Sequence, residues 1–413
     1  MNKAIKLNGI GKSFKGNARQ YGMLMALIVI IIFFQILTGG RLLFPMNVSN
    51  IVFQNAYVVI LATGMLLCIL TGGNIDLSVG SVVAVVGACA GTFIISWGWN
   101  VYLSIALCML IGILIGMWQG FWIAYVKIPP FIVTLAGMLV FRGLCLLILN
   151  GMTLAPFPAE YLVFSTGFIA KGSKIVLFGT TVNIVCLITG IAVALIAWVL
   201  QFVSRKNRIR KGYAVENFWL MVIRMIIISA ALIFFFTLLA QYQGIPTVLV
   251  LLTILLVIYT FFTTKTVVGR HIYAIGGNEK AARLSGIKTQ HLMFFAYTNM
   301  GFLAGIAGLV FAARLNSASP LAGQNFELDA IGACFIGGAS AYGGVGTVGG
   351  ALIGALIMGI LNNGMSIMGI NSNTQQVVKG LVLLGAVAFD VINKMNLSLF
   401  RRYKRNIAAE AKS

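Results

Sequence analysis

Long runs of apolar residues, separated by short polar or basic connectors, recur from near residue 20 to about residue 392. Several runs reach the roughly 20 residues that a helix needs to cross the hydrocarbon core of a bilayer. Backbone groups in lipid must form hydrogen bonds within their own segment, so runs of this length predict helices. Only 9% of the residues are charged, against about a quarter in soluble domains. The chain is therefore predicted to be an all-α polytopic membrane protein.

The hydropathy pattern divides the chain into about 12 candidate transmembrane segments, some of them interrupted or re-entrant. The seven prolines fall at proposed loops or helix starts, which supports the boundaries. The spans lie approximately at 20–38, 51–71, 78–97, 102–126, 131–150, 177–203, 218–241, 247–264, 290–313, 328–343, 347–368 and 374–392.

The distribution of basic residues predicts the orientation of these spans. A net charge of +21 would suggest nucleic-acid binding in a soluble chain. Here, 22 of the 29 Lys and Arg residues fall in segments on the cytoplasmic side if the N-terminus is cytoplasmic. This is the positive-inside distribution of a multi-pass protein. We therefore expect both termini in the cytoplasm, contact with membrane lipid, and no nucleic-acid partner.

Patterns for catalysis, metal binding or nucleotide binding are missing from the sequence. The "GKS" at 11–13 lacks the earlier glycine of a P-loop, and "GVGTVG" at 344–349 joins two membrane segments instead of a strand and a helix. His271 and His291 have no ligand-like neighbours, and the six cysteines show no CxxC spacing. We predict no enzyme activity, no catalytic residue, no metal site and no cofactor bound by this chain itself.

Glycines recur at intervals of four in three of the candidate spans. In lipid, such small-residue spacing lets helix backbones approach closely, so packing is the simplest interpretation. The three sets are Gly112, Gly116 and Gly120; Gly301 and Gly305; and Gly346, Gly350 and Gly354.

Two polar, glycine-flanked breaks interrupt the apolar pattern, "TGGNIDLSVGS" at 71–81 and "NFELDAIGACFIGGASAYGGVG" at 325–346. Asp76 and Asp329 each precede a short apolar segment, where an acid either caps the helix or marks a functional site. The predicted topology opens the first helix from the cytoplasmic side and the second from outside. Interrupted helices of opposite orientation indicate an inverted repeat, with the transport pathway at the breaks.

Six ordered segments carry a family resemblance: "GNIDLSVGSVVAVVGA", "KIPPFIVTLAGMLVFRGL", "GRHIYAIGGNEKAARLSGIKT", "AGLVFAARLNSASPLAG", "ELDAIGACFIGGASAYGGVGTVGGALIGALIMGILNNGMS" and "QQVVKGLVLLGAV". They resemble segments of the membrane permeases of bacterial ATP-binding cassette sugar importers, of the xylose or multiple-monosaccharide type. The ribose and galactose permeases are related. The likeness runs from about residue 20 to 395, which is almost the whole chain.

The resemblance implies an inverted-repeat permease core that works with other subunits. These are a cytoplasmic ATPase, which uses ATP and Mg, an extracytoplasmic sugar-binding protein, and a second permease copy in an expected homodimer. It also implies a location in the bacterial cytoplasmic (inner) membrane. The domains are then a cytoplasmic tail at 1–19, the transmembrane permease domain at 20–395 and a basic cytoplasmic tail at 396–413. An added helix pair around 200–246 is similar to the longer, xylose-type members.

The charged segment "GRHIYAIGGNEKAARLSGIKTQHL" falls in the predicted cytoplasmic loop at 265–289. Asn278 can cap a short helix with Glu279 in its first turn, and Gly286 can end it. The resemblance places an ATPase-docking coupling helix at 276–287, whereas a merely solvated loop helix is the alternative. The predicted coupling residues are Gly276, Gly277, Asn278, Glu279, Ala281, Ala282, Arg283 and Gly286.

A neutral, polyhydroxylated sugar is best matched by uncharged hydrogen-bonding groups at the helix breaks and faces, because they replace water without fixing a counter-ion. External loops at 151–175 and 314–327 are expected to meet the binding protein. The predicted pathway residues are Asn74, Asp76, Ser78, Asn316, Glu327, Asp329, Asn362, Asn363 and Gln375.

The sequence thus predicts the transmembrane subunit of an ATP-driven importer for xylose or for several pentoses and hexoses. The alternative is an ion-coupled secondary sugar transporter that acts alone. Such a carrier needs an ionisable group deep in the bundle. The intramembrane acids are instead predicted at span ends, which disfavours that alternative.

Overall fold

Long apolar helices make up most of the computed structural model, which describes residues 22–169, 171–177, 180–213, 215 and 217–410, with 177, 180 and 393–410 as backbone only. Among these residues, ten helices are long and apolar enough to cross a membrane, and a helix over Gly22–Leu37 is shorter. The predicted all-α polytopic class is confirmed. The predicted tail at 1–19 lies outside the described residues, as do the side chains of the tail at 396–413.

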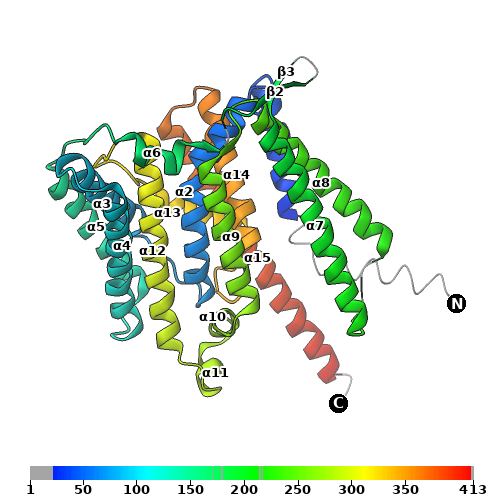
Figure 1. The fold of residues 1–413 in the computed structure, drawn as a ribbon. Coiled ribbons are helices and arrows are strands. Elements are labelled where there is room, and N and C mark those ends of the chain that lie inside the picture. The colour runs from blue at the N-terminus through cyan, green and yellow to red at the C-terminus, as the bar shows by residue number, and fades with distance from the viewer. Residues whose placement is uncertain (1–21, 170, 178–179, 214, 216, 411–413) are drawn as a thin grey trace.

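The helices follow the predicted order of spans, with short helices between some of them (Figure 1). Their bounds are α2 Pro45–Leu70, α3 Val79–Gly91 with a π-helical turn at Thr92–Ser96, α4 Val101–Ala124, α5 Pro130–Leu149, α6 Ala159–Thr166, α7 Ile184–Arg210, α8 Phe218–Ala240, α9 Thr247–Lys265, α10 Val267–Gly277, α11 Glu279–Leu284, α12 Thr289–Leu315, α13 Phe326–Ile336, α14 Val348–Ile367 and α15 Ser372–Glu410.

Two small antiparallel ribbons lie at the end of the molecule opposite α11 (Figure 1). Strands β2 (Lys174–Leu177) and β3 (Thr180–Asn183) form a hairpin just before α7. Strands β1 (Phe168–Ile169) and β4 (Ile245–Pro246) join the chain on either side of the α7–α8 pair. These ribbons close the α7–α8 insertion at its base.

Helices α2 and α12 form the centre of the bundle. Most of α2 is buried, and α12 has its most extensive contacts with α4, α2 and α3. The α4–α12 contact is close because glycines face each other: a methyl group at Gly112 would lie 2.6 Å from the carbonyl oxygen of Gly301. On α14, Gly350 and Gly354 lie in the same way against the backbone of α13. The predicted close packing is confirmed for these glycines, whereas Gly346 lies in the loop before α14 and not on a helix.

The predicted span at 328–343 is not one continuous helix. Helix α13 has only 11 residues, and the chain from 337 to 347 forms an irregular loop before α14. The hydropathy window read α13 and part of this loop as one span because both are rich in apolar and small residues. The structure therefore places an interrupted helix at this second break.

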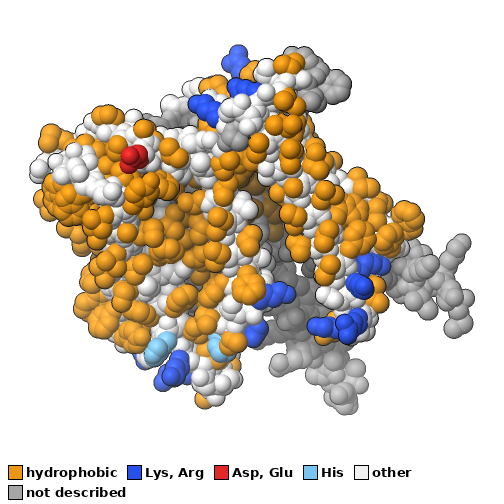
Figure 2. Space-filling model, in the orientation of Figure 1, with side chains coloured by type: hydrophobic (Ala, Val, Ile, Leu, Met, Phe, Trp, Pro, Cys, Tyr) orange, Lys and Arg blue, Asp and Glu red, His pale blue; other side chains and the backbone are white. Residues whose placement is uncertain are grey.

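Helices α7 and α8 form a hairpin at one side of the bundle (Figure 1). The span predicted at 177–203 begins later, at Ile184, and continues to Arg210. As a consequence, the basic residues 205–210 lie in the last helical turns instead of in a loop. Figure 2 shows hydrophobic side chains over most of the visible face, with Lys and Arg gathered along the lower edge and near β2–β3.

Candidate functional site

Helices α3 and α13 begin against each other inside the bundle. A methyl group added at Gly80 would collide with the carbonyl oxygen of Gly323 and lie 2.5 Å from Glu327 Oε2. Farther along α3, Gly91 lies against Ala318. The segment from Ala318 to Gly323 therefore follows α3 back into the bundle before α13 starts. From this meeting point α3 runs toward the β2–β3 end and α13 toward the α11 end.

A buried chain of hydrogen bonds holds the start of α3. Ser78 donates to Asp76 Oδ1 from its backbone N–H at 2.8 Å and from its hydroxyl at 2.7 Å. Gln119 Nε2 of α4 donates to Ser78 Oγ at 2.5 Å, and all three residues are buried. Asp76 thus supports the turn just ahead of α3, close to the capping role that the sequence predicts, and Ser78 links it to α4.

The re-entrant segment before α13 is held by a cation from α5. Arg142 Nη1 donates to the carbonyl oxygens of Pro320 and Ala322, at 2.9 and 2.7 Å. Irregular backbone away from water needs such partners, because lipid offers none. Arg142 was absent from the predicted site, although an arginine inside an apolar run is itself a sign of function or of buried pairing.

Asp329, on α13, forms an ion pair with α15. Lys379 Nζ lies 3.0 Å from Asp329 Oδ1 and 3.3 Å from Oδ2, and the hydroxyl of Tyr57 on α2 donates to Oδ2 at 2.8 Å. The Tyr57 ring stacks on Phe326 with centroids 3.7 Å apart. The Asp329 carboxylate therefore joins two other helices instead of capping its own, and Lys379 and Tyr57 are additions to the predicted site.

Helices α3 and α13 have equivalent packing partners in the two halves of the chain. Helix α3 packs on α5, which supplies Arg142, and α13 packs on α15, which supplies Lys379. These two partner helices correspond to the predicted spans at 131–150 and 374–392, which begin near Phe131 and Gln375. An inverted repeat makes these two spans equivalent. The contact pattern agrees with that repeat. The predicted acids do lie at helix starts, but these starts are inside the bundle.

A cluster of amides joins α2 to α14. Asn363 Nδ2 donates to Asn47 Oδ1 at 3.0 Å and to Gln54 Oε1 at 3.2 Å. Asn47 Nδ2 returns a hydrogen bond to Asn363 Oδ1 at 2.8 Å. The neighbouring Asn362 has a buried Oδ1 with no hydrogen-bond partner in the described part of the chain. Of the two predicted asparagines, Asn363 is committed to this cluster and Asn362 keeps an open acceptor.

Three predicted pathway residues make contacts away from the α3–α13 meeting point. Asn74 Nδ2 donates to Thr71 in the turn after α2. Asn316 ends α12 and accepts from the backbone N–H of Phe157. Gln375 Nε2 donates to the carbonyl of Ile370 in the α14–α15 connection. These contacts give each of the three a structural role in a turn.

The predicted coupling segment folds as two short helices, α10 and α11. Asn278 Oδ1 accepts from the backbone N–H of Ala281 at 3.0 Å, and Gly286 follows the end of α11 with a φ of 83°, so the predicted cap and stop are confirmed. Of the predicted coupling residues, Ala282 is buried and Gly276 half-buried; the rest are exposed. Leu284 is 90% exposed. The sequence did not single it out, because a leucine in a short helix usually faces the core.

Helix α10 ends against the last residue of α2 and the irregular loop that follows α13. A methyl group at Gly276 would collide with the carbonyl oxygen of Leu70 and the amide nitrogen of Gly344. Gly344 itself donates to the Leu70 carbonyl at 3.2 Å, and Tyr273 Oη donates to the Gly346 carbonyl at 2.8 Å. We call this contact of α10, the end of α2 and the 337–347 loop the glycine joint.

The described part of the chain contains no group of three His, Cys, Asp or Glu that could hold a metal ion. His271 and His291 lie on separate helices, α10 and α12. The site thus offers neutral hydrogen-bonding groups, the Asp329–Lys379 ion pair, and the charged side chains of Asp76 and Arg142, which bind a serine and two backbone carbonyls. That chemistry suits passage of a polar solute better than bond making or breaking.

Comparisons with known proteins agree with this arrangement. The model of a family described as "Branched-chain amino acid transport system / permease component" matches residues 47–387. The xylose transport system permease protein XylH of Escherichia coli K12 is 41% identical over 385 residues, covering 92% of this chain and 93% of that protein. The ribose import permease protein RbsC of Bacillus subtilis is 35% identical over 377 residues, or 91% and 94%. No solved structure matches.

Replacing Lys379 with methionine should destabilise the bundle by about 3 kcal/mol, because it leaves the Asp329 carboxylate buried without its counter-ion. Adding Asp329→Asn to Lys379→Met should recover part of that loss. Thermal unfolding of the purified protein in detergent measures both. Lys280→Met, at an exposed lysine of α11, serves as the control and should change stability by no more than about 0.5 kcal/mol. Strictly additive losses in the double variant would contradict the pairing.

Proposed function

The chain belongs to the family of transport-system permease components, and from that premise we propose that it is the transmembrane subunit of an ATP-driven importer of monosaccharides. The observation that carries the proposal is the likeness to a xylose permease over 92% of the chain. Xylose, or several pentoses and hexoses, is the proposed substrate class. The chain is a transport subunit and not an enzyme, in a multi-pass arrangement in the bacterial cytoplasmic (inner) membrane.

ATP hydrolysis belongs, in this proposal, to a separate cytoplasmic ATPase that binds ATP and Mg, so the permease needs no cofactor of its own. Helix α11 is the proposed dock. The apolar side chain of Leu284 is exposed to solvent, and Glu279 and Arg283 are also exposed on the same short helix. An apolar centre with a charged rim is the usual composition of a protein interface.

The α11 end of the bundle is proposed to be cytoplasmic, together with both termini. Lys265 lies in the last turn of α9, Arg270 on α10, and Arg208 and Arg210 in the last turn of α7. Figure 2 shows Lys and Arg side chains gathered along this lower edge. This is the side on which membrane proteins accumulate basic residues. The opposite end, with the loop at 151–175, then receives the sugar-binding protein; of the predicted loop at 314–327, the stretch from Ala318 to Gly323 instead follows α3 into the bundle.

The proposed pathway passes the meeting point of α3 and α13. Ser78 and Gln119 offer neutral hydrogen-bonding groups there, and Asn362 and Asn363 extend them along α14. Lys379 neutralises Asp329, so the ion pair presents no net charge to a passing solute. Groups of this kind exchange hydrogen bonds with sugar hydroxyls without holding a counter-ion.

A second copy of the chain completes the proposed permease as a homodimer. Helix α15 is attached mainly through α13 and is the least buried of the ten membrane-length helices. Its exposed apolar side chains include Val377, Leu381, Leu384 and Phe389. A surface of this kind fits either a partner copy or lipid, and the family resemblance, which implies a second permease copy, favours the partner.

The glycine joint gives α11 a route to the pathway. A shift of α10 must move the Leu70 carbonyl and Gly344, because backbone touches backbone without an intervening side chain. Leu70 leads into the turn before α3, and the loop containing Gly344 follows α13. A docked ATPase can therefore move both interrupted helices together.

Reconstitution tests the proposed function. Proteoliposomes that contain the permease, its ATPase and its sugar-binding protein should accumulate labelled xylose or a related monosaccharide only when ATP and Mg are present. Leaving out any one component should abolish uptake. Accumulation driven by a proton or sodium gradient in liposomes that contain the permease alone would instead establish the secondary carrier.

Leu284→Asp should weaken ATPase binding by about tenfold or more, because a buried apolar anchor at an interface commonly contributes about 2 kcal/mol. Co-purification of the ATPase with tagged permease measures the loss. Val176→Asp is the matched control, since Val176 is also strongly exposed, at 72%, but lies on β2 at the end opposite α11. Equal co-purification of the two variants would remove α11 as the dock.

Gly276→Ala should uncouple ATP hydrolysis from sugar uptake. The added methyl group has no room at the glycine joint, and overpacking of about 1–3 kcal/mol should lower uptake by roughly tenfold while ATPase binding and ATP hydrolysis persist. Gly277→Ala is the control, because a methyl group there meets nothing within 4 Å. Normal uptake by Gly276→Ala, or loss of ATPase binding, would contradict transmission through the joint.

A further inference from the structure

The α7–α8 hairpin is attached to the bundle mainly at one end. Near β2–β3, a small apolar cluster joins Phe236 and Leu239 of α8 to Val48 at the start of α2. Helix α7 packs chiefly on α8, and toward the α11 end the hairpin stands away from the bundle (Figure 1). That end of α7 therefore has no extensive packing on the described helices of the permease core.

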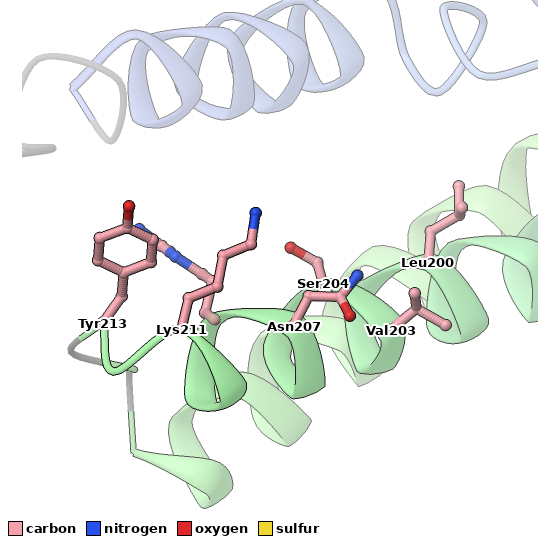
Figure 3. A pocket seen from close by; sticks show the side chains of 7 residues that line it. Leu200, Val203, Ser204, Asn207, Lys211 and Tyr213 are labelled. Carbon is pink, nitrogen blue, oxygen red and sulfur yellow. The ribbon is translucent and has the colours of Figure 1, made fainter.

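A cavity of about 490 Å³ lies at this end of the hairpin. Arg208 and Lys211 line it together with the neutral polar residues Ser204 and Asn207, and Tyr213 contributes from the loop that follows. Figure 3 shows the side chains of Ser204, Asn207 and Lys211 projecting from the last turns of α7, with the Tyr213 ring beside Lys211. Among the described residues, the lining holds two cations and no carboxylate.

The other wall of the cavity is apolar and continues along the helix. Leu200 and Val203 line the cavity, and Leu200 is 64% exposed. Val199, Ile196 and Leu195 extend this exposed apolar surface toward the middle of α7. A ligand that satisfies the whole site must be anionic at one end and hydrocarbon at the other.

We propose that this cavity binds the headgroup of an anionic phospholipid, whose acyl chains lie along the exposed apolar surface of α7. Basic pockets beside membrane helices attract anionic headgroups, and guanidinium groups bind phosphate oxygens with two parallel hydrogen bonds. The end of α7 carries the negative pole of the helix dipole, which repels an anion. The side chains of Arg208 and Lys211, not the backbone, must therefore hold the phosphate.

Nearby basic residues provide a matched control. Lys206 and Arg210 lie on the same helical turns but do not line the cavity, whereas Arg205 is already placed over the Phe218 ring at 5.6 Å. The pair Arg208→Gln with Lys211→Gln and the pair Lys206→Gln with Arg210→Gln remove the same total charge. Only the first pair changes the cavity.

Native mass spectrometry of the full chain in a neutral detergent, titrated with phosphatidylglycerol or phosphatidylcholine, tests the proposal. The unaltered protein should bind phosphatidylglycerol in preference to phosphatidylcholine. The cavity pair should weaken phosphatidylglycerol binding by about 25-fold, since each cation near an anionic lipid contributes roughly fivefold. The control pair should stay within about twofold, as expected for charges that do not touch the headgroup.

Several outcomes would overturn the assignment. Equal losses in the two pairs would mean that net charge alone attracts the lipid. Equal binding of the two lipids would remove the anionic headgroup from the proposal. Displacement of phosphatidylglycerol by millimolar glycerol phosphate would indicate a site for a soluble phosphate. Unchanged lipid binding together with lost ATPase co-purification in the cavity pair would assign the cavity to protein contact.

Discussion

Satisfying backbone polar groups inside the bundle is the constraint on which the rest of the structure depends. Helices α3 and α13 both begin within the bundle, so the irregular segments before them carry N–H and C=O groups that lipid cannot solvate. Side chains of neighbouring helices supply the partners. Arg142 binds two carbonyls ahead of α13, and Asp76 accepts from Ser78 ahead of α3. Helices α2, α12 and α14 are mostly buried because they enclose these contacts.

Enclosure of this kind needs helices that approach more closely than ordinary side chains permit. Gly112 and Gly301 provide that approach between α4 and α12, whose contact is the most extensive between helices of the described chain. Gly276 and Gly344 use the same lack of side chains differently, since they join α10 to the end of α2 and to the loop after α13. Close glycine contacts therefore both hold the helices of the bundle together and connect the bundle to α10 and α11.

Hydropathy predicted the long helices because a helix that crosses the bilayer needs a continuous run of apolar residues. The window failed at 328–343, where small residues of an irregular loop are nearly as apolar as a helix. Arg142 and Lys379 were visible as cations in apolar runs, but their partners lie 178 and 50 residues away in the sequence. Such pairings depend on tertiary structure, so a single sequence does not reveal them. Leu284 escaped notice because exposure, not residue type, makes it unusual.

The charges inside the helix bundle bear on how transport is driven. Moving one elementary charge through 100 mV is worth roughly 2.3 kcal/mol, but a neutral sugar gains nothing from that potential. Lys379 neutralises Asp329 within the bundle, and the amides around Asn363 are uncharged. An importer of a neutral sugar must therefore take its free energy from conformational work. In the proposed function that work enters at the exposed α11, which Gly276 joins to the end of α2 and to the loop after α13.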